Sequence, residues 1–428
     1  MEDINNIYFN LLKQNLGTKT EAISLYCPEL MPSGNAIPYS LANQELLNFF
    51  NVTSYSDIKK DGHVLDRPMN LNVVKMQAGL GSSVKRSDIV EKFAHRKNLG
   101  AKGTDLFLPV EGEYKSISEL QLLQAISLED EECIGQVTYT NLVNDETKDV
   151  VEKDWSKPYS LQETYQEKFA SSPKLCRGED IFQKKMPTIG EDGELTTERM
   201  APAGHGFVGV NALMNVFNNH EANNITIIGN GEDLNSTPET PLLKWVAKNK
   251  IPVTMITTTK TKDDLKGGQI SLLKSGEKNF LTIVEKAQAE ESNQLKYFEE
   301  LGLRDADREA LFNTNIVVIN EAALREKFSL LKDIDLELFL QAIAPDVISN
   351  VKEQDGKKFT QLESALGSVM LNLDRHFRAN FDEKIVSIVN VSPEDREGFF
   401  IPIKKREDYD RLTRDYAVSI ENYRVFKK

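Results

Sequence analysis

The amino-acid sequence predicts an α/β fold in which helices flank a mostly parallel sheet. From Leu71 onward, apolar runs of four to seven residues alternate with longer stretches of helical character, which is the rhythm of βαβ units. The composition is that of a globular protein, with 40% hydrophobic and 28% charged residues, so fibrous, collagen-like and disordered classes are disfavoured. The length of 428 residues suggests two or three domains of about 150 residues, enough for a sizeable core.

The expected strands are short and apolar. They cover residues 71–76, 225–228, 253–258 and 316–319. After the strand at 225–228 come the polar residues 229–233, and then Ser236 or Thr237, either of which can cap a helix that runs through Trp245. Polar groups should therefore gather at the carboxyl end of this strand, where open α/β sheets bind ligands.

The chain is expected to divide into three parts. Residues 1–65 indicate short helices, of which 38–50 is the clearest amphipathic run, and residues 66–400 hold the alternating pattern of the main domain. Residues 401–428 form a short basic segment with eight Lys and Arg against five Asp and Glu. These cations can face phosphates or only solvent.

Charge and cysteine content limit the partners and the compartment. The formal net charge of −14 repels nucleic acid and anionic lipid, so we expect neither a nucleic-acid nor a membrane partner. The three cysteines, Cys27, Cys133 and Cys176, are widely spaced, which predicts no disulfide framework and no zinc site and fits a reducing, cytoplasmic setting. The acidic start lacks the features of a signal peptide, and no apolar stretch approaches eighteen residues.

A loop of small residues follows the first expected strand. It consists of Ala78, Gly79, Leu80 and Gly81, followed by two serines and then by Lys85 and Arg86. Backbone N–H groups in such a loop can cradle phosphate oxygens, because glycine lets the backbone approach and cations lie near. A plain strand-to-helix turn is an equally open interpretation.

A histidine stands between two glycines further along the chain. His205 follows Gly204 and precedes Gly206, in a loop too poor in large side chains to bury an imidazole in a core. The ring is then free to contact an anion, or it is an ordinary surface histidine.

Other polar residues each have an ordinary alternative. Glu232 and Asp233 can hold Mg²⁺ or serve as helix-cap chemistry. Gly268 ends a polar loop, and Asn315 can read hydroxyl groups or form a turn. Glu285 can be a solvated helical carboxylate.

Taken in order, these motifs resemble those of the eukaryotic-type UTP–glucose-1-phosphate uridylyltransferase (UDP-glucose pyrophosphorylase) family, within the wider group of UDP-sugar pyrophosphorylases. The family's Gly-Gly-Leu-Gly-Thr-Ser is similar to Ala-Gly-Leu-Gly-Ser-Ser here, and its Lys-Thr-x-x-Asp-x-Lys-Gly-Gly is matched at every fixed position. Nine motifs occur in the family's order, at residues 78–83, 183–187, 202–206, 230–234, 260–268, 285–288, 312–315, 361–367 and 400–404.

The resemblance implies a fold and an activity. The implied fold is a GT-A-like, Rossmann-like nucleotide-diphospho-sugar transferase domain over residues 66–400, with a mixed, mainly parallel sheet and flanking helices. The implied reaction forms UDP-glucose and pyrophosphate from UTP and glucose 1-phosphate with Mg²⁺, and another sugar 1-phosphate is the alternative substrate. Such a reaction depends on positioning and on charge neutralisation.

The resemblance also implies roles for single residues. Nucleotide contacts fall to Ala78, Gly79, Leu80, Gly81, Gln183 and Gly204. Sugar hydroxyl contacts fall to Asn230, Gly268, Glu285 and Asn315. Charged contacts fall to His205 and Lys404 on the phosphates, and to Glu232, with Asp233 beside it, on Mg²⁺.

This chain departs from the family pattern after the glycine loop. The family's Lys-Gly-Pro-Lys-Ser has its nearest match at residues 102–105, where Asp105 replaces the second lysine. Lys85, Arg86 or Lys102 can supply the missing charge, or the chain is a catalytically weak nucleotide-sugar-binding or regulatory protein. Only 24 residues follow Lys404, which leaves no room for the family's C-terminal β-helix, so a monomer or a small homo-oligomer is expected.

The last motif predicts which residues face the site. If residues 399–405 form a regular strand, Phe400 and Pro402 share a face with Lys404, while Ile401 and Ile403 point to the other face. The neighbouring Lys405 and Arg406 are expected to be solvated.

Overall fold

A computed structural model describes most of the chain. The described residues are 3–15, 24–25, 51–81, 84–96, 98–128, 131–155, 174–264, 267–275, 278–291, 295–300, 310–331, 336–354 and 356–428. The expected amphipathic run at 38–50 lies outside them, as do Cys27 and the two serines of the glycine loop.

Helices and strands alternate along much of the chain. The helices are α1 (Ile4–Asn15), α3 (Tyr55–Lys60), α4 (Ser87–Lys92), α5 (Lys102–Asp105), α6 (Ile117–Ser127), α7 (Lys148–Trp155), α10 (Gly206–Asn218), α11 (Thr240–Lys248), α12 (Lys286–Glu291), α13 (Leu295–Glu300), α14 (Glu321–Phe328), α15 (Leu336–Ile343), α16 (Leu366–Phe381) and α17 (Arg406–Asp415). The strands are β1 (Ser24–Leu25), β2 (Val52–Ser54), β3 (Met69–Met76), β4 (Phe107–Val110), β5 (Glu113–Ser116), β6 (Ile134–Val143), β7 (Leu175–Arg177), β8 (Ile181–Phe182), β9 (Met186–Ile189), β10 (Leu195–Ala201), β11 (Ile225–Asn230), β12 (Val253–Thr259), β13 (Gln269–Ser275), β14 (Lys278–Val284), β15 (Leu311–Asn320), β16 (Val347–Gln354), β17 (Lys357–Ser364), β18 (Val386–Val391), β19 (Tyr416–Val418) and β20 (Val425–Lys427).

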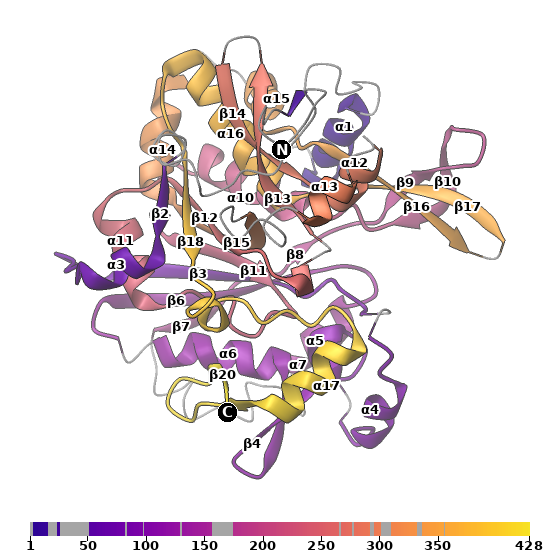
Figure 1. Ribbon diagram of the computed structural model, residues 1–428, viewed down its shortest axis with the longest axis vertical. Helices are drawn as coiled ribbons and strands as arrows, with labels where there is room; N and C mark the ends of the chain where they lie inside the picture. The colour runs from indigo at the N-terminus through magenta and orange to yellow at the C-terminus, as the bar shows by residue number, and fades with distance from the viewer. Residues whose placement is uncertain are drawn as a thin grey trace.

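One large sheet organises the molecule (Figure 1). Its main path runs β2-β18-β12-β15-β11-β3-β6-β7, and β13 and β14 extend it from β15. The pairs β11·β3, β3·β6, β12·β18 and β18·β2 are parallel, whereas β15 runs antiparallel to both β11 and β12. The predicted mixed, mainly parallel α/β sheet is confirmed.

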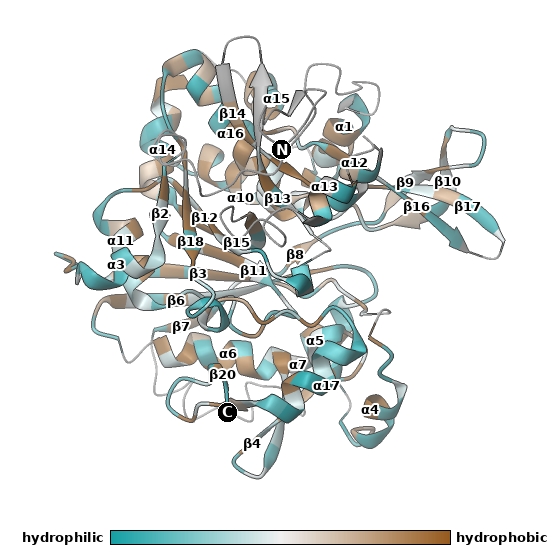
Figure 2. Ribbon diagram, in the orientation of Figure 1, coloured by the Kyte–Doolittle hydropathy of each residue, from teal (hydrophilic) through white to brown (hydrophobic). Residues whose placement is uncertain are grey.

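The central strands are buried because helices cover both faces of the sheet. Every residue of β11 is buried, and the central strands are among the brown segments of Figure 2. One hydrophobic cluster joins this sheet to α10, α14 and α16, and a second joins its other face to α6 and α11. Burial on both faces explains why these strands are continuous apolar runs in the sequence.

A second, smaller sheet projects from the body (Figure 1). It has the order β10-β9-β17-β16 and is antiparallel. Its strand β17 ends at Ser364, which returns to the loop that carries His205.

The two ends of the described chain join the same body. In the amino-terminal part, β2 pairs with β18, and Tyr8 of α1 lies in the main core cluster. In the carboxyl-terminal part, Tyr409 and Leu412 of α17 pack with Leu106 and Phe107. The division at residues 65 and 400 stays a prediction.

The segment before α17 differs from the expected strand. It is extended, but its pairing with the described residues is limited to one isolated bridge, between Pro402 and Asp233. The expected alternation of side chains is nevertheless present, because Phe400 lies against Phe312 while Ile401 and Ile403 enter the cluster that contains α17.

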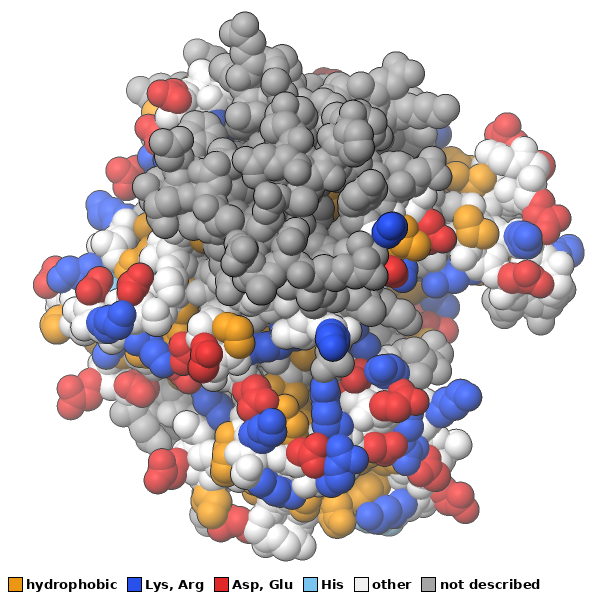
Figure 3. Space-filling view, in the orientation of Figure 1, with side chains coloured by type: hydrophobic (Ala, Val, Ile, Leu, Met, Phe, Trp, Pro, Cys, Tyr) orange, Lys and Arg blue, Asp and Glu red, His pale blue; other side chains and the backbone are white. Residues whose placement is uncertain are grey.

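Charges on the C-terminal segment are largely balanced by neighbours. Figure 3 shows Lys and Arg side chains interspersed with Asp and Glu over the surface around α17. Arg406 is partly exposed, and beyond the expected contact with solvent its guanidinium pairs with Asp88 at 2.7 Å and with Asp410 at 2.8 Å. Lys405 is exposed, as expected.

Among the described residues, we find no helix with both the length and the apolarity needed to span a bilayer.

Candidate active site

The predicted site residues gather at one edge of the large sheet, where β3 and β11 end. The final pair of these parallel strands joins Met76 to Asn230, so the loops that follow them start side by side. The antiparallel β15 presents its first residues at this edge, since Phe312 pairs with Thr258 near the end of β12. Topology therefore brings together motifs that lie more than 200 residues apart in the sequence.

The glycine loop after β3 is held by its backbone carbonyls. Asn144 donates its side-chain amide to the Ala78 carbonyl at 2.9 Å, and the Lys102 N–H donates to the Gly79 carbonyl at 3.0 Å. Gly81 has a φ of +65°, and a Cβ there would stand 2.6 Å from Cγ of Lys102. Glycine is thus needed at position 81 because it can adopt the positive φ and because a larger residue would clash with the Lys102 side chain.

Lys102 connects this loop to the predicted metal residue. Lys102 as a whole residue is 7% exposed, and its Nζ lies 3.4 Å from Oε1 of the partly exposed Glu232. Of the three cations that the sequence offered for the missing charge, Lys102 is the one whose side chain runs across the loop to the next strand end. Lys85 is exposed.

Asp105 does not leave an unbalanced negative charge. It is 2% exposed, and its carboxylate accepts hydrogen bonds from Arg86 Nε at 2.7 Å and from the Gly100 N–H at 2.6 Å. Arg86 also donates to the Gly81 carbonyl at 2.8 Å. The Arg86–Asp105 pair therefore anchors the far end of the glycine loop, a role that the sequence alone did not indicate.

Asp233 lies beneath the site. It is completely buried; one carboxylate oxygen accepts from the Ile401 N–H at 2.7 Å, and the other has no hydrogen-bond partner among the described residues. Burial raises the pKa of Asp233 to about 7, and burial lowers the pKa of the neighbouring Lys75 to about 7. A carboxylate enclosed in this way does not suit a metal ion shared with a substrate, so of the two candidates the geometry favours Glu232.

Asp233 ties two parts of the site together. The Ile403 N–H also contacts the Glu232 carbonyl at 3.4 Å, so the segment that ends in Lys404 is docked on the loop after β11. The prediction that Ser236 or Thr237 caps the next helix is wrong, because Glu239 occupies the N-cap, and Ser236 instead accepts a hydrogen bond from buried Lys75 Nζ at 2.9 Å. The following helix starts later, at Thr240, with Glu239 at its N-cap.

Lys404 lies where several charged groups converge. Its ammonium stands 5.2 Å from the ring centre of Phe312, and a Cβ on Gly267 would come within 3.5 Å of it. Burial lowers the pKa of Lys404, while the carboxylates of Asp264, Glu285 and Glu232 oppose that shift. The Glu232 carboxylate thus pairs with Lys102 and also acts electrostatically on Lys404, which comes from a different segment.

Glu285 lies against the paired glycines of the preceding loop. A Cβ at Gly268 would stand 2.6 Å from Oε1 of Glu285, so only glycine admits this carboxylate. Burial raises the pKa of Glu285 to about 7, with Lys404 acting in the opposite direction. This carboxyl group is poised to change charge near neutral pH.

A bulge in β15 orients the asparagines. The register of β15 against β12 shifts between Asn313 and Ile316, and Asn315 takes a φ of +59°. The Asn313 amide donates to Oδ1 of Asn315 at 2.8 Å. Asn230 donates to the Thr314 carbonyl at 3.4 Å, so Asn230 and Asn315 are neighbours through this bulge.

The loop with His205 is built on β17. Gly204, at φ +80°, forms a bridge with Ser364, whose carbonyl oxygen would lie 2.5 Å from a Cβ on that glycine. Gln183 donates to the Gly204 carbonyl at 2.9 Å. His205 is exposed at the start of α10 and its side chain makes no capping bond, as the flanking glycines suggested.

Two groups of residues result. The first contains the glycine loop, Lys102, Glu232, Lys404 and Glu285, and the second contains Gln183, Gly204 and His205. Glu363 connects them, because its charge acts on Glu285 and its Cβ would be 3.2 Å from a Cβ at Gly204.

Sequence reasoning missed a clamp on the loop before Gly267. Arg396 pairs with Asp264 through both carboxylate oxygens, at 2.6 and 2.7 Å, and Asp264 in turn accepts from Thr261. Asp264 stands in the Lys260–Gly268 motif, but nothing local to residue 396 indicated its partner. Lys260 of that motif is buried and donates to the carbonyls of Phe298 and Glu299.

The described residues contain no group of three or more His, Cys, Asp or Glu side chains that could hold a metal ion by themselves.

Known proteins share this fold. A UDP-glucose pyrophosphorylase from Leishmania major, solved in complex with UDP-glucose, matches with a TM-score of 0.59 and 20% identity over 86% of this chain and 71% of that one. A protein from Trypanosoma brucei described as a UDP-glucose phosphorylase matches with a TM-score of 0.57 and 18% identity over 99% of this chain and 77% of that one. At these identities the likeness concerns the fold.

Sequence relatives carry one name. The UTP–glucose-1-phosphate uridylyltransferase of Solanum tuberosum is 28% identical over 197 residues, which cover 46% of this chain and 34% of the relative. That of Musa acuminata is 24% identical over 383 residues, 87% of this chain and 68% of the relative. The alignment with the potato protein thus spans about a third of that protein.

The family match covers more than half of the chain. The model of the family described as UTP–glucose-1-phosphate uridylyltransferase matches residues 143–420, which include the His205 loop, Glu232, Glu285 and Lys404. The chain belongs to the UTP–glucose-1-phosphate uridylyltransferase family.

Proposed function

We propose that this protein transfers a uridylyl group from UTP to glucose 1-phosphate, forming UDP-glucose and releasing pyrophosphate. The observation that carries the proposal is the convergence of Lys102, Glu232 and Lys404 beside a glycine loop, in a chain of this family. Two cations and one partly exposed carboxylate at a sheet edge suit a reaction between two phosphate-bearing substrates.

In the proposed reaction, a phosphate oxygen of glucose 1-phosphate attacks the α-phosphorus of UTP in line. A P–O bond forms to the sugar phosphate, and the bond from the α-phosphorus to the departing pyrophosphate breaks. The protein has to bring two anions together and to stabilise the charge that moves onto the leaving group. Lys102 and Lys404 supply positive charge for this purpose, and His205 adds a donor at the sugar phosphate.

Binding of the two organic groups is assigned to the flanking loops. Ala78, Gly79, Leu80 and Gly81 offer backbone N–H groups to the nucleotide, and Gln183 with Gly204 faces the uracil. Asn230, Gly268, Glu285 and Asn315 would contact the sugar hydroxyls. Carboxyl and amide groups are suited to that task because each oxygen accepts, and each amide nitrogen donates, hydrogen bonds.

We further propose Mg²⁺ as the cofactor, held by Glu232 and by substrate phosphates. Such an ion neutralises phosphate charge when it is bound. Glu232 fits because it is partly exposed and lies beside the lysines, whereas Asp233 does not fit because it is buried and bonded to Ile401.

The cytoplasmic setting stays a prediction, and the free thiols of Cys133 and Cys176 agree with it.

The structure bears on the alternative of a binding protein without turnover. That alternative was motivated by Asp105, whose charge is matched by Arg86. Pyrophosphate release measured with UTP over a panel of sugar 1-phosphates tests the proposal. Turnover with glucose 1-phosphate supports it; turnover only with another sugar 1-phosphate changes the substrate; tight UDP-glucose binding without turnover refutes the activity.

A further inference from the structure

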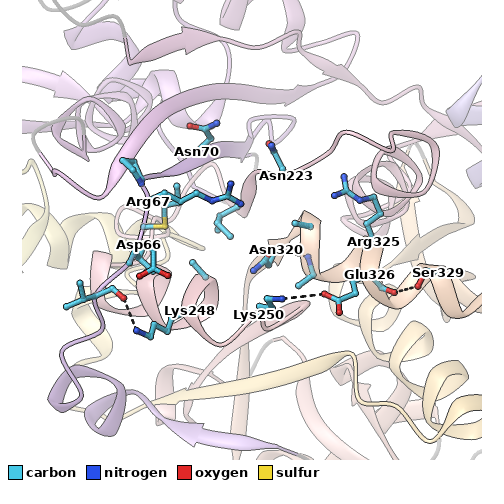
Figure 4. A pocket seen from close by; sticks show the side chains of 18 residues that line it. Asp66, Arg67, Asn70, Asn223, Lys248, Lys250, Asn320, Arg325, Glu326 and Ser329 are labelled. Carbon is cyan, nitrogen blue, oxygen red and sulfur yellow. Dashed lines mark hydrogen bonds and ion pairs between the residues drawn. The ribbon is translucent and has the colours of Figure 1, made fainter.

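A cavity of about 950 Å³ lies at the opposite edge of the large sheet from the candidate active site (Figure 4). At this edge Ile225 begins β11 and pairs with Leu71 of β3, whereas Asn230 and Met76 form the pair at the active-site edge. At about 3.3 Å per residue, the two ends of β11 are about 17 Å apart. The cavity is therefore separate from the residues assigned to catalysis.

Four parts of the chain build its walls. The turn before β3 and the start of that strand contribute residues 64–70, and the start of β11 contributes Asn223 and Ile225. The end of α11 contributes Lys248 and Lys250, and the start of α14 follows Asn320 at the end of β15. The antiparallel direction of β15 brings these together, because Asn320 pairs with Ile225. The walls thus rest on central strands of the sheet.

The cavity is positively charged in an acidic protein. Its charged lining residues are Arg67, Lys248, Lys250 and Arg325 against Asp66 and Glu326. This is an excess of two positive charges in a chain whose formal net charge is −14. Because its surroundings are acidic overall, such a local excess favours an anion at this place rather than elsewhere on the surface.

Most of these cations are already used to hold the walls. Lys248 Nζ donates to the Val64 carbonyl at 3.1 Å, and Arg325 donates to the His220 and Ala222 carbonyls, both at 2.6 Å. Lys250 lies 3.9 Å from Glu326. Arg67 is different, since its guanidinium makes no hydrogen bond or ion pair with any described residue, and Figure 4 shows it reaching toward the middle of the cavity.

Two amides also lack partners within the described chain. Asn70 and Asn223 are exposed, and no described residue hydrogen-bonds to their side chains, whereas Asn320 is occupied in capping α14 through the Ala323 N–H. In the view of Figure 4 both free amides stand above the Arg67 guanidinium. A planar cation beside two amides matches a ligand that carries a phosphate next to hydroxyl or carbonyl groups.

We propose that this cavity binds a phosphorylated, hydroxyl-bearing small molecule, with Arg67 on the phosphate and Asn70 and Asn223 on the hydroxyl groups. The proposal does not depend on the uridylyltransferase reaction, because none of these residues belongs to the active-site edge. Removal of Arg67 should leave the fold unchanged, since the side chain is exposed and bonds to no residue in the described part of the chain.

Equilibrium dialysis at constant ionic strength tests the proposal with three probes: inorganic phosphate, glucose 6-phosphate and AMP. We expect at least one organic probe to bind more tightly than phosphate, and Arg67→Ala to weaken that binding about tenfold or more. Asn223→Ala should weaken the binding of the organic probe and leave the binding of inorganic phosphate unchanged. Lys60→Ala, at an exposed lysine nearby in the sequence, should change the binding of neither probe.

The opposite results are equally clear. If no probe binds, or if Arg67→Ala binds all three as the unmodified protein does, the cavity is not such a site. If Lys404→Ala rather than Arg67→Ala abolishes binding, the probes occupy the candidate active site, and the proposal is overturned. Circular dichroism of each variant shows that the fold is retained, and the Arg67→Gln variant repeats the test with a side chain of similar length.

Discussion

Replacement of Lys404 by alanine tests the charge arrangement of the proposed site. The substitution removes an ammonium whose charge interacts with the carboxylates of Glu232, Glu285 and Asp264 and with the ammonium of Lys102. A unit charge about 4 Å from a phosphate contributes about 4 kcal/mol at an effective dielectric constant of about 20. Part of this is present in the ground state, so we expect Lys404→Ala to lose about 2–4 kcal/mol of transition-state stabilisation, roughly 30- to 1000-fold in kcat/KM.

The fold should survive this substitution. The backbone N–H of Lys404 keeps its hydrogen bond to Asp408, and loss of the contact with the Phe312 ring costs about 1 kcal/mol. Initial rates of pyrophosphate release from UTP and glucose 1-phosphate measure the effect. Lys404→Arg should recover part of the activity, because a planar fork replaces a point charge.

Lys405→Ala is the matched control. Lys405 is adjacent in the sequence but exposed, so we expect an effect below about twofold. Equal losses at Lys404 and Lys405, or no loss at either, would refute the assignment of Lys404 to the substrate phosphates.

Four further predictions test other parts of the account. His205→Ala should lose about 2–4 kcal/mol of transition-state stabilisation, roughly 30- to 1000-fold in kcat/KM. The melting temperature should not change, because the exposed ring makes no capping bond; an unchanged kcat/KM would remove His205 from the site. Glu232→Gln should raise the Mg²⁺ concentration needed for half-maximal rate much more than Asp233→Asn does; the reverse order would move the metal to Asp233. Arg86→Ala should lower the free energy of unfolding, measured in urea, by about 3 kcal/mol, because it leaves the buried Asp105 without its counter-charge. The control Lys85→Ala should lower it by less than about 0.5 kcal/mol. Equal losses of stability in the two variants would contradict the role of the Arg86–Asp105 pair as an anchor of the glycine loop. Glu285, with a pKa raised to about 7, takes up a proton as the pH falls through 7 and then attracts Lys404 less. Activity should therefore decline below pH 7, and this decline should be absent in Glu285→Gln. An identical pH profile in the variant would show that another group titrates.

The positions of the central strands could be predicted because burial leaves a local signal. The expected strand at 225–228 lies within β11, and the one at 253–258 lies within β12. Strand direction could not be predicted in the same way. A strand buried on both faces has the same apolar pattern whether it is parallel or antiparallel, so nothing within residues 316–319 revealed that β15 runs against its neighbours.

Long-range polar partners were also beyond the sequence. In the sequence, Asp105 stands where the family has a lysine and was interpreted as a loss of positive charge, and only the fold shows that Arg86 neutralises it. Asp233 read as a second metal ligand, because a carboxylate beside Glu232 carries no local sign of burial. Ser236 read as a helix cap, whereas its hydroxyl is taken by Lys75 from a strand that ends far earlier in the chain. The glycine positions were easier to predict, because the positive φ that Gly81 and Gly204 adopt is a local property of the backbone that favours glycine.

The most direct measurement follows labelled pyrophosphate in the reverse direction. The protein is incubated with UDP-glucose, Mg²⁺ and ³²P-pyrophosphate, and the UTP fraction is isolated and counted. We predict that label enters UTP only when UDP-glucose is present, and that Lys102→Ala slows this incorporation at least about tenfold while UDP-glucose still binds. Absence of label from UTP in the unmodified protein, with UDP-glucose bound, would contradict the account and show a site that binds the nucleotide sugar without transferring the uridylyl group.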